Sequence, residues 1–237
     1  MTQSAERSTI VEFSGIPGAG KSFLAHELAT MLGADGELVD EPLSVVSPQL
    51  RTSRRVTRKL WLAAIEALRD PVAAAGIAAA LIRSGQTTSD LVHRLQNWLV
   101  VRALFRRSRR RPGTHVFDQG IVQELCSIGY RGRWQVCLES AAPGRRDLAP
   151  DVIVRVATPV STAAQRLATR RGTQSRVEKL EPGEQDRVLR GQVIELDEIE
   201  RAWVDQFGRS RGTRRVEVDN DGTSVGAALD RIRDELR

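Results

Sequence analysis

The stretch "GIPGAGKS", Gly15 to Ser22, decides the fold of this chain. It satisfies the pattern G-x-x-x-x-G-K-[ST], in which glycines let backbone N–H groups converge on a phosphate. The run before it, Thr9–Ser14, is β-branched at its start and predicts a strand, and Ser22–Leu32 has its leucines spaced for one face of a helix. A glycine loop between a strand and a helix is the context that phosphate binding requires, because the helix N-terminus adds its dipole.

We therefore predict a nucleoside triphosphate site at this loop. Lys21 is expected to reach the β- and γ-phosphate oxygens, and the Ser22 hydroxyl to bind Mg²⁺. Lysine is rare in this chain, since only Lys21, Lys59 and Lys179 occur among 36 basic residues. A lysine at the position that the motif requires is therefore not expected by chance. The residues expected to contact ATP are Gly15, Ile16, Pro17, Gly18, Ala19, Gly20, Lys21, Ser22 and Phe23.

Strands and helices alternate along the rest of the chain, which predicts an α/β fold of the P-loop NTPase type. We expect a mainly parallel, five-stranded sheet with helices on both faces, in three layers, forming one domain over residues 1–237. The predicted strands are Thr9–Ser14, Glu37–Asp40, His115–Asp118, Asp151–Ala157 and Arg214–Asp219. The predicted helices after the first are Pro71–Ile82, Thr88 to about Arg110, Val160–Thr169, Gln185–Phe207 and Thr223–Leu236.

Two carboxylates stand at the ends of predicted strands, where ligands collect in open α/β sheets. Asp118 ends the third strand and is the expected partner of Ser22 in holding Mg²⁺. Glu41 follows the second strand and is the expected general base toward an acceptor hydroxyl. We also name Trp98 as a candidate for lining an acceptor pocket.

A group of arginines follows the predicted helix Val160–Thr169. Arg170, Arg171 and Arg176, with Gly172 among them, predict an arginine-bearing lid over about residues 170–184. Phosphoryl transfer needs positive charge over the γ-phosphate, and a lid can supply it while excluding water. These three arginines are therefore predicted catalytic residues.

The net charge of +6 is concentrated in two runs, Arg51–Lys59 and Arg106–Arg111. Neither run is interleaved with aromatic residues, as a single-stranded nucleic-acid platform would be, so we interpret both as solvated helix ends and expect no nucleic-acid partner. The apolar segment Pro71–Ile82 fits either a homodimer surface or a buried core helix.

The compositional features favour a cytoplasmic protein without a membrane partner. No apolar run approaches the roughly 20 residues of a membrane span, and the polar N-terminus has no signal-peptide core. Cys126 and Cys137 are the only cysteines and form no CxxC pair, which favours a reducing compartment and two ordinary thiols.

The order of these parts resembles the deoxynucleoside kinase and thymidylate kinase branch of the P-loop phosphotransferases, over nearly the whole chain. The resemblance rests on the N-terminal P-loop, "DEP" after the second strand, "LQNW" in a long helix and a strand ending "FDQG". It continues through "DVIVRV", the arginine-rich "RLATRRGTQSR" and a last strand ending "VDNDG". It implies an ATP- and Mg²⁺-dependent kinase.

The resemblance also implies roles for particular residues. Glu41, followed by Pro42, stands where the family carries the base that accepts the 5′-hydroxyl proton, and Gln96 stands where a glutamine reads the nucleobase edge. Asp118 matches the carboxylate that serves magnesium. The lid corresponds to Arg166–Arg176, and Asp219–Gly222 would flank the ATP base.

One departure concerns the acceptor. Gln119 replaces the arginine of the family's acidic-Arg pair, a residue that meets the acceptor or its phosphates, and Arg131 or Arg133 is a candidate to substitute for it. Three functions stay open from the sequence: a nucleoside or nucleotide kinase, a kinase of a sugar, an antibiotic or another hydroxylated metabolite, and a nucleotide switch or nucleic-acid-associated ATPase.

Overall fold

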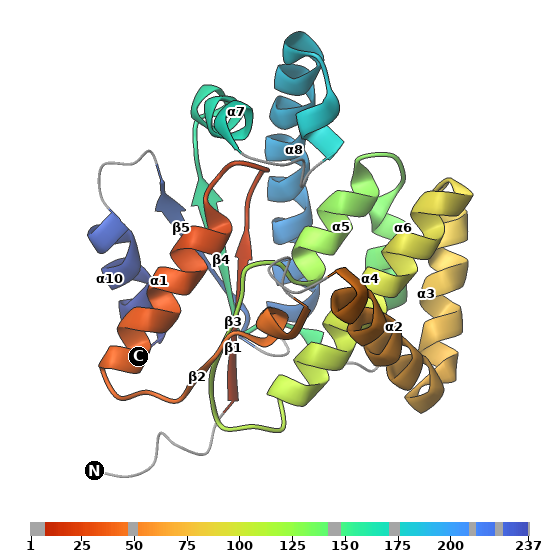
Figure 1. The fold of residues 1–237 in the computed structure, drawn as a ribbon, viewed down its shortest axis with the longest axis horizontal. Helices are drawn as coiled ribbons and strands as arrows, with labels where there is room; N and C mark the ends of the chain where they lie inside the picture. The colour runs from red at the N-terminus through yellow and green to blue at the C-terminus, as the bar shows by residue number, and fades with distance from the viewer. Residues whose placement is uncertain are drawn as a thin grey trace.

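The fold is built on a five-stranded parallel sheet with strand order β2-β3-β1-β4-β5 (Figure 1). The computed structural model describes residues 8–46, 52–141, 148–170, 176–208, 212–220 and 225–236. The strands are β1 (Ser8–Ser14), β2 (Val39–Asp40), β3 (Gly113–Phe117), β4 (Val152–Ala157) and β5 (Arg214–Asp219). The predicted α/β fold with its parallel sheet is confirmed.

Helices cover both faces of this sheet. On one face lie α1 (Lys21–Ala34) and α10 (Val225–Leu236), and on the other lie α4 (Thr88–Ser108), α5 (Ile121–Gly129) and α8 (Pro182–Trp203) (Figure 1). Outside α4 and α5 lie α2 (Thr52–Arg69), α3 (Pro71–Arg83) and α6 (Trp134–Ala141). The helix α7 (Val160–Thr169) contacts α8, and η2 (Pro42–Val46), η4 (Arg176–Lys179) and the π-helical turn η5 (Val204–Gly208) complete the set.

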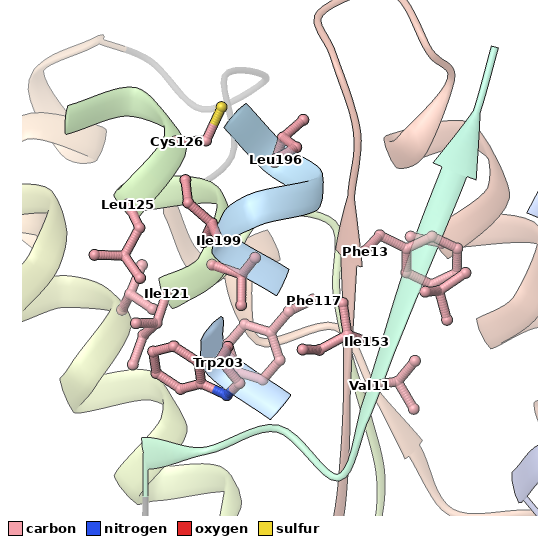
Figure 2. Close-up of a cluster of buried hydrophobic side chains, with 14 of the residues drawn as sticks. Val11, Phe13, Phe117, Ile121, Leu125, Cys126, Ile153, Leu196, Ile199 and Trp203 are labelled. Carbon is pink, nitrogen blue, oxygen red and sulfur yellow. The ribbon is translucent and has the colours of Figure 1, made fainter. Parts of the chain in front are cut away.

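The core lies where the central strands meet these helices, because those strands are apolar on both faces. Val11, Phe13 and Ile153 are fully buried in β1 and β4. Phe117, Ile121, Leu125, Ile199 and Trp203 fill the space between the sheet, α5 and α8 (Figure 2). This packing holds the carboxyl ends of β1 and β3 side by side, at the edge where the P-loop begins.

Several predicted boundaries need correction. The second strand is only Val39–Asp40, after a turn at Gly36, and the third ends at Phe117, so Asp118 lies just beyond it. The long helix begins at Pro182 rather than Gln185, which places residues 182–184 in α8 instead of the lid. The first residues of the predicted last helix lie outside the described residues.

The second arginine run is not a solvated helix end throughout. Arg106 pairs with Glu66 at 2.9 Å, and Arg109 pairs with Asp151 at 2.5 Å and donates to the Ser8 carbonyl. These arginines therefore tie α4 to α2 and to the sheet. Within the described ranges, no helix combines the length and the apolar character needed to cross a bilayer.

Candidate active site

The P-loop between β1 and α1 is held in shape from two sides. Asn220, just after β5, donates from Nδ2 to the Ala19 carbonyl at 2.7 Å, and Arg166 of α7 donates to the Asn220 carbonyl at 3.0 Å. Gly20 has a φ of +92°, and a Cβ there would lie 2.2 Å from Asn220 Nδ2. The glycine is therefore required both for the backbone conformation and for the close approach of Asn220.

Lys21 turns back onto this loop. Its Nζ donates to the Gly15 carbonyl at 2.7 Å and to the Ile16 carbonyl at 3.1 Å. Burial is the main cause that lowers the pKa of Lys21 to about 8, and the nearby arginines Arg155 and Arg170 lower it further. The lysine thus lies where a phosphate group would both replace the carbonyl partners and restore its ordinary pKa.

Ser22 and Asp118 meet across the sheet edge, although 96 positions separate them in the sequence. The Ser22 hydroxyl donates to Asp118 Oδ2 at 2.6 Å. The pairing follows from the strand order, because β1 and β3 are neighbours and their carboxyl ends meet. The two residues predicted to hold Mg²⁺ therefore lie together.

Glu41 lies in the turn between β2 and η2. Its side chain is 39% exposed, and its Oε2 lies 3.3 Å from His26 Nδ1 of α1. Gln119, which follows Asp118, is exposed. Both side chains are open to solvent beside the sheet edge that carries the P-loop.

Helix α5 braces the P-loop, a role that no pattern in the sequence indicated. The Gln123 side-chain oxygen accepts from the Gly15 N–H at 3.3 Å, and the Gln123 N–H donates to the buried carboxyl of Glu12 at 3.1 Å. Burial raises the pKa of Glu12 to about 8. A Cβ on Gly120 would lie 2.3 Å from Glu12 Cδ, so only glycine fits at the start of α5.

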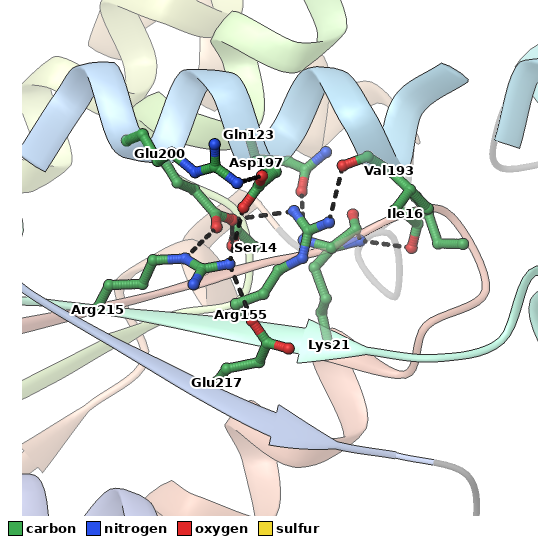
Figure 3. A network of polar contacts seen from close by, with 12 residues as sticks. Ser14, Ile16, Lys21, Gln123, Arg155, Val193, Asp197, Glu200, Arg215 and Glu217 are labelled. Carbon is green, nitrogen blue, oxygen red and sulfur yellow. Dashed lines mark hydrogen bonds and ion pairs between the residues drawn. The ribbon is translucent and has the colours of Figure 1, made fainter. Parts of the chain in front are cut away.

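A second buried network lies under the loop, between β1, β4, β5 and α8 (Figure 3). Glu200 of α8 is fully buried and accepts from the Ser14 hydroxyl, from Arg155 Nη1 at 3.1 Å and from Arg215 Nε at 2.7 Å. Arg155 also donates to the Val193 carbonyl at 3.1 Å. This network ties the helix that follows the predicted lid to the residue directly before Gly15.

A polar cluster between α2, α4 and α5 was also missed. Lys59 Nζ donates to Asn97 Oδ1 at 3.3 Å, and Arg94 Nη1 lies 3.7 Å from Glu124 Oε2. Glu124 is 9% exposed, and its Oε2 and the Arg94 Nε have no hydrogen-bond partner within the described part of the chain. The rarity of lysine, which singled out Lys21, could have singled out Lys59 as well.

The remaining predicted residues fall in different places. Gln96 is half-buried in α4, directly before Asn97 of this cluster. Trp98 is 2% exposed and packs in the core, because it lies on the inner face of α4, and its role in an acceptor pocket stays a prediction. Arg131 lies beyond α5 and is 54% exposed, 3.5 Å from Asp90, at the far end of α4 from its arginine-rich terminus.

The predicted lid is only partly described. Arg170 is 40% exposed and pairs with Glu178 at 3.4 Å. Arg171 and the side chain of Arg176 lie outside the described residues. The catalytic role of the three arginines stays a prediction.

Comparison with known proteins identifies the fold. No family model and no curated protein matches the sequence. A structure of deoxyadenosine kinase from M. mycoides with bound dATP aligns with a TM-score of 0.54 and 12% identity, over 96% of this chain and 98% of that one. Structures of the M. mycoides enzyme with dCTP, and with dCMP and a flexible dCDP, align over the same shares with TM-scores of 0.47 and 0.48 and identities of 16% and 14%. The chain therefore has the fold of a deoxynucleoside kinase-like P-loop kinase.

Proposed function

We propose that this protein is a phosphotransferase that moves the γ-phosphoryl group of ATP, with Mg²⁺, to a hydroxyl group of a nucleoside. The observation that carries the proposal is the meeting of Lys21, Ser22 and Asp118 at one edge of the sheet. The fold shared with a deoxyadenosine kinase supports the nucleoside as acceptor.

The residues present fit a magnesium ion. Mg²⁺ is usually held by one or two carboxylates together with substrate phosphates and water, rather than by a cage of protein ligands. Ser22 and Asp118 would supply one hydroxyl and one carboxylate beside the phosphate loop. When bound, the ion would neutralise charge on the β- and γ-phosphate oxygens.

The protein's own groups then divide the work of transfer. The backbone N–H groups from Gly15 to Ser22 and the Lys21 ammonium would hold the phosphates. Glu41 would accept the proton of the acceptor hydroxyl. At the same time the oxygen of that hydroxyl would bond to the γ-phosphorus, and the bond between the γ-phosphorus and the leaving oxygen of ADP would break. Asp219 and Ile16 line a cavity of about 570 Å³ between α8 and the ends of β4 and β5, which supports placing the donor base there.

For the acceptor we propose the polar cluster beside Gln96. Lys59, Arg94, Asn97 and Glu124 come from three helices. Glu124 Oε2, which is ion-paired with Arg94 at 3.7 Å, and Arg94 Nε have no hydrogen-bond partner in the described structure. A buried polar atom without a partner is costly, so a ligand that pairs with it gains both affinity and selectivity. A nucleobase edge offers such a donor and acceptor side by side.

The experiment is ADP release from ATP and Mg²⁺ with a panel of deoxynucleosides, ribonucleosides, their monophosphates, sugars and aminoglycosides. We expect turnover with a nucleoside, and we expect Gln96→Ala and Glu124→Gln each to reduce discrimination between bases about tenfold or more. Selectivity is measured as the ratio of kcat/KM values between two bases, with Glu198→Gln on the exposed side of α8 as control. Turnover with sugars or aminoglycosides alone would contradict the nucleoside acceptor.

Binding of ATP should depend on pH through Lys21. Its pKa is lowered to about 8 in the free protein, and a bound phosphate raises it again. Below pH 8 the Lys21 ammonium is charged and pairs with the phosphate without taking up a proton. Above pH 8 the affinity for ATP falls by at most tenfold per pH unit. Titration calorimetry in two buffers of different ionisation enthalpy should show proton uptake on ATP binding above pH 8, and affinity that stays constant to pH 10 would contradict it.

A further inference from the structure

The helices α2 and α3 carry most of the exposed apolar side chains in the described structure. Of the eleven large hydrophobic residues that are exposed there, seven lie on these two adjacent helices. Single exposed apolar residues are ordinary, but a concentration of them on one part of a surface marks an interaction site. We call them the α2–α3 surface: Val56, Leu60, Trp61, Ile65, Leu68, Val72 and Ile82.

Three residues of this surface lie on a face of α2 that the helix does not use inside the protein. Ala63 and Glu66 are the buried residues of α2, on the face that packs against α4. Trp61, Ile65 and Leu68 follow at steps of four and three residues on another face, with exposed fractions of 63%, 39% and 82%. A surface helix needs only one apolar face to pack against the core, so the second apolar face of α2 is available to a partner.

The exposed charged residues of α2 and α3 themselves all have one sign. Between Thr52 and Arg83 the only acidic residues are Glu66 and Asp70, and both pair with Arg102 and Arg106 of α4. The arginines that remain on the outside are Arg54, Arg58, Arg69 and Arg83. A partner that complements both features of α2 and α3 is apolar and negatively charged.

We propose that the α2–α3 surface binds to the surface of an anionic lipid bilayer. A basic amphipathic helix with tryptophan and leucine on its apolar face lies in the plane of such an interface without crossing it. The two helices lie at the edge of the molecule away from α10, so a bilayer can reach them without displacing the sheet (Figure 1). A second copy of the chain fits less well, because a two-fold contact would place like charges together.

This proposal differs from the expectation from sequence that the protein has no membrane partner. It concerns adsorption rather than insertion, and it joins two features that the phosphoryl-transfer site leaves unused. These are the exposed arginines at the start of α2, Arg54 and Arg58, and the apolar helix α3.

The test is flotation of the full-length protein with vesicles of phosphatidylcholine alone and of phosphatidylcholine with 30% phosphatidylglycerol. We expect binding to the anionic vesicles only, weakening as salt is raised. Trp61 reports the contact, because Trp98, Trp134 and Trp203 are at most 7% exposed. Tryptophan emission should shift to shorter wavelength on binding and be quenched by brominated lipids.

Variants locate the contact. The double change Trp61→Ser and Leu68→Ser should abolish binding, and Arg54→Gln and Arg69→Gln should each weaken it about fivefold. Ile194→Ser and Arg190→Gln on α8, which are 63% and 68% exposed, are the matched controls and should bind as the parent does. Unchanged thermal melting shows that the variants are folded.

Two outcomes overturn the proposal. Absence of binding to anionic vesicles at low salt does so outright. The partner is a second copy instead if sedimentation shows a dimer that the Trp61→Ser and Leu68→Ser changes dissociate, while vesicles leave the fluorescence unchanged.

Discussion

Replacing Lys21 by alanine is expected to lower the rate of phosphoryl transfer by a factor on the order of 10³, about 4 kcal/mol of transition-state stabilisation. The ammonium group lies among P-loop carbonyls, at 2.7 and 3.1 Å, and has no carboxylate within ion-pair distance in the described structure. Its strongest partner would therefore be the phosphate of the ligand. The free energy of unfolding should change little, because the hydrogen bonds of Lys21 to Gly15 and Ile16 connect only neighbouring residues of one loop.

The measurement is kcat/KM for ADP release with the best acceptor of the panel, together with the thermal midpoint of unfolding. Arg190→Ala, which removes an exposed cation of α8 that pairs with Asp186 on the same helix, serves as the matched control and should keep full activity. Lys21→Ala with unchanged turnover would refute the site. A large fall in the thermal midpoint would show a structural role instead.

Replacing Glu200 by glutamine is expected to lower the free energy of unfolding by about 3 kcal/mol or more. The change keeps the shape of the side chain but removes the negative charge that faces Arg155 and Arg215. Arg155 is only 7% exposed, so water cannot replace the lost partner. An unpaired buried charge costs more than the pair itself contributes, which is why the effect is large.

Urea denaturation at pH 7 measures this effect, and Glu198→Gln is the control because it lies two residues away on the exposed side of α8. Its free energy of unfolding should change by less than about 0.5 kcal/mol. A Glu200→Gln protein as stable as the parent would mean that solvent or a nearby carboxylate compensates the arginines.

The sheet could be predicted from the sequence because each strand carries its own signal. Thr9–Ser14 and Asp151–Ala157 are apolar runs bounded by turn residues, and the observed strands β1 and β4 agree with them within one residue. The helices α5 and α6 were not predicted. The apolar residues of Ile121–Gly129 are spaced for one face of a helix, but the segment is only nine residues long and is bounded by Gly120 and Gly129, so its signal is short.

The candidate site also contains residues that could be predicted from the sequence and residues that could not. Lys21, Ser22 and their loop could be found because the motif is local, and Asp118 because it directly follows a strand. The sequence could not reveal the roles of Glu12, Gln123 and Glu200. Each of these side chains bonds to a partner more than a hundred positions away, and Glu200 also depends on the packing of α8 on the sheet. Trp98 is buried in the core, and this could not be predicted from its position in the sequence; its place in an acceptor pocket stays a prediction.

The position of β1 in the middle of the sheet has a consequence for synthesis of the chain. β1 leaves the ribosome first, yet its neighbours in the sheet start at Gly113 on one side and Val152 on the other. A nascent chain that ends before Gly113 therefore has no strand to pair with Ile10, Val11 and Phe13, which are fully buried once folding is complete. The strand that leads into the phosphate loop thus stays exposed to chaperones and to aggregation until β3 has been made.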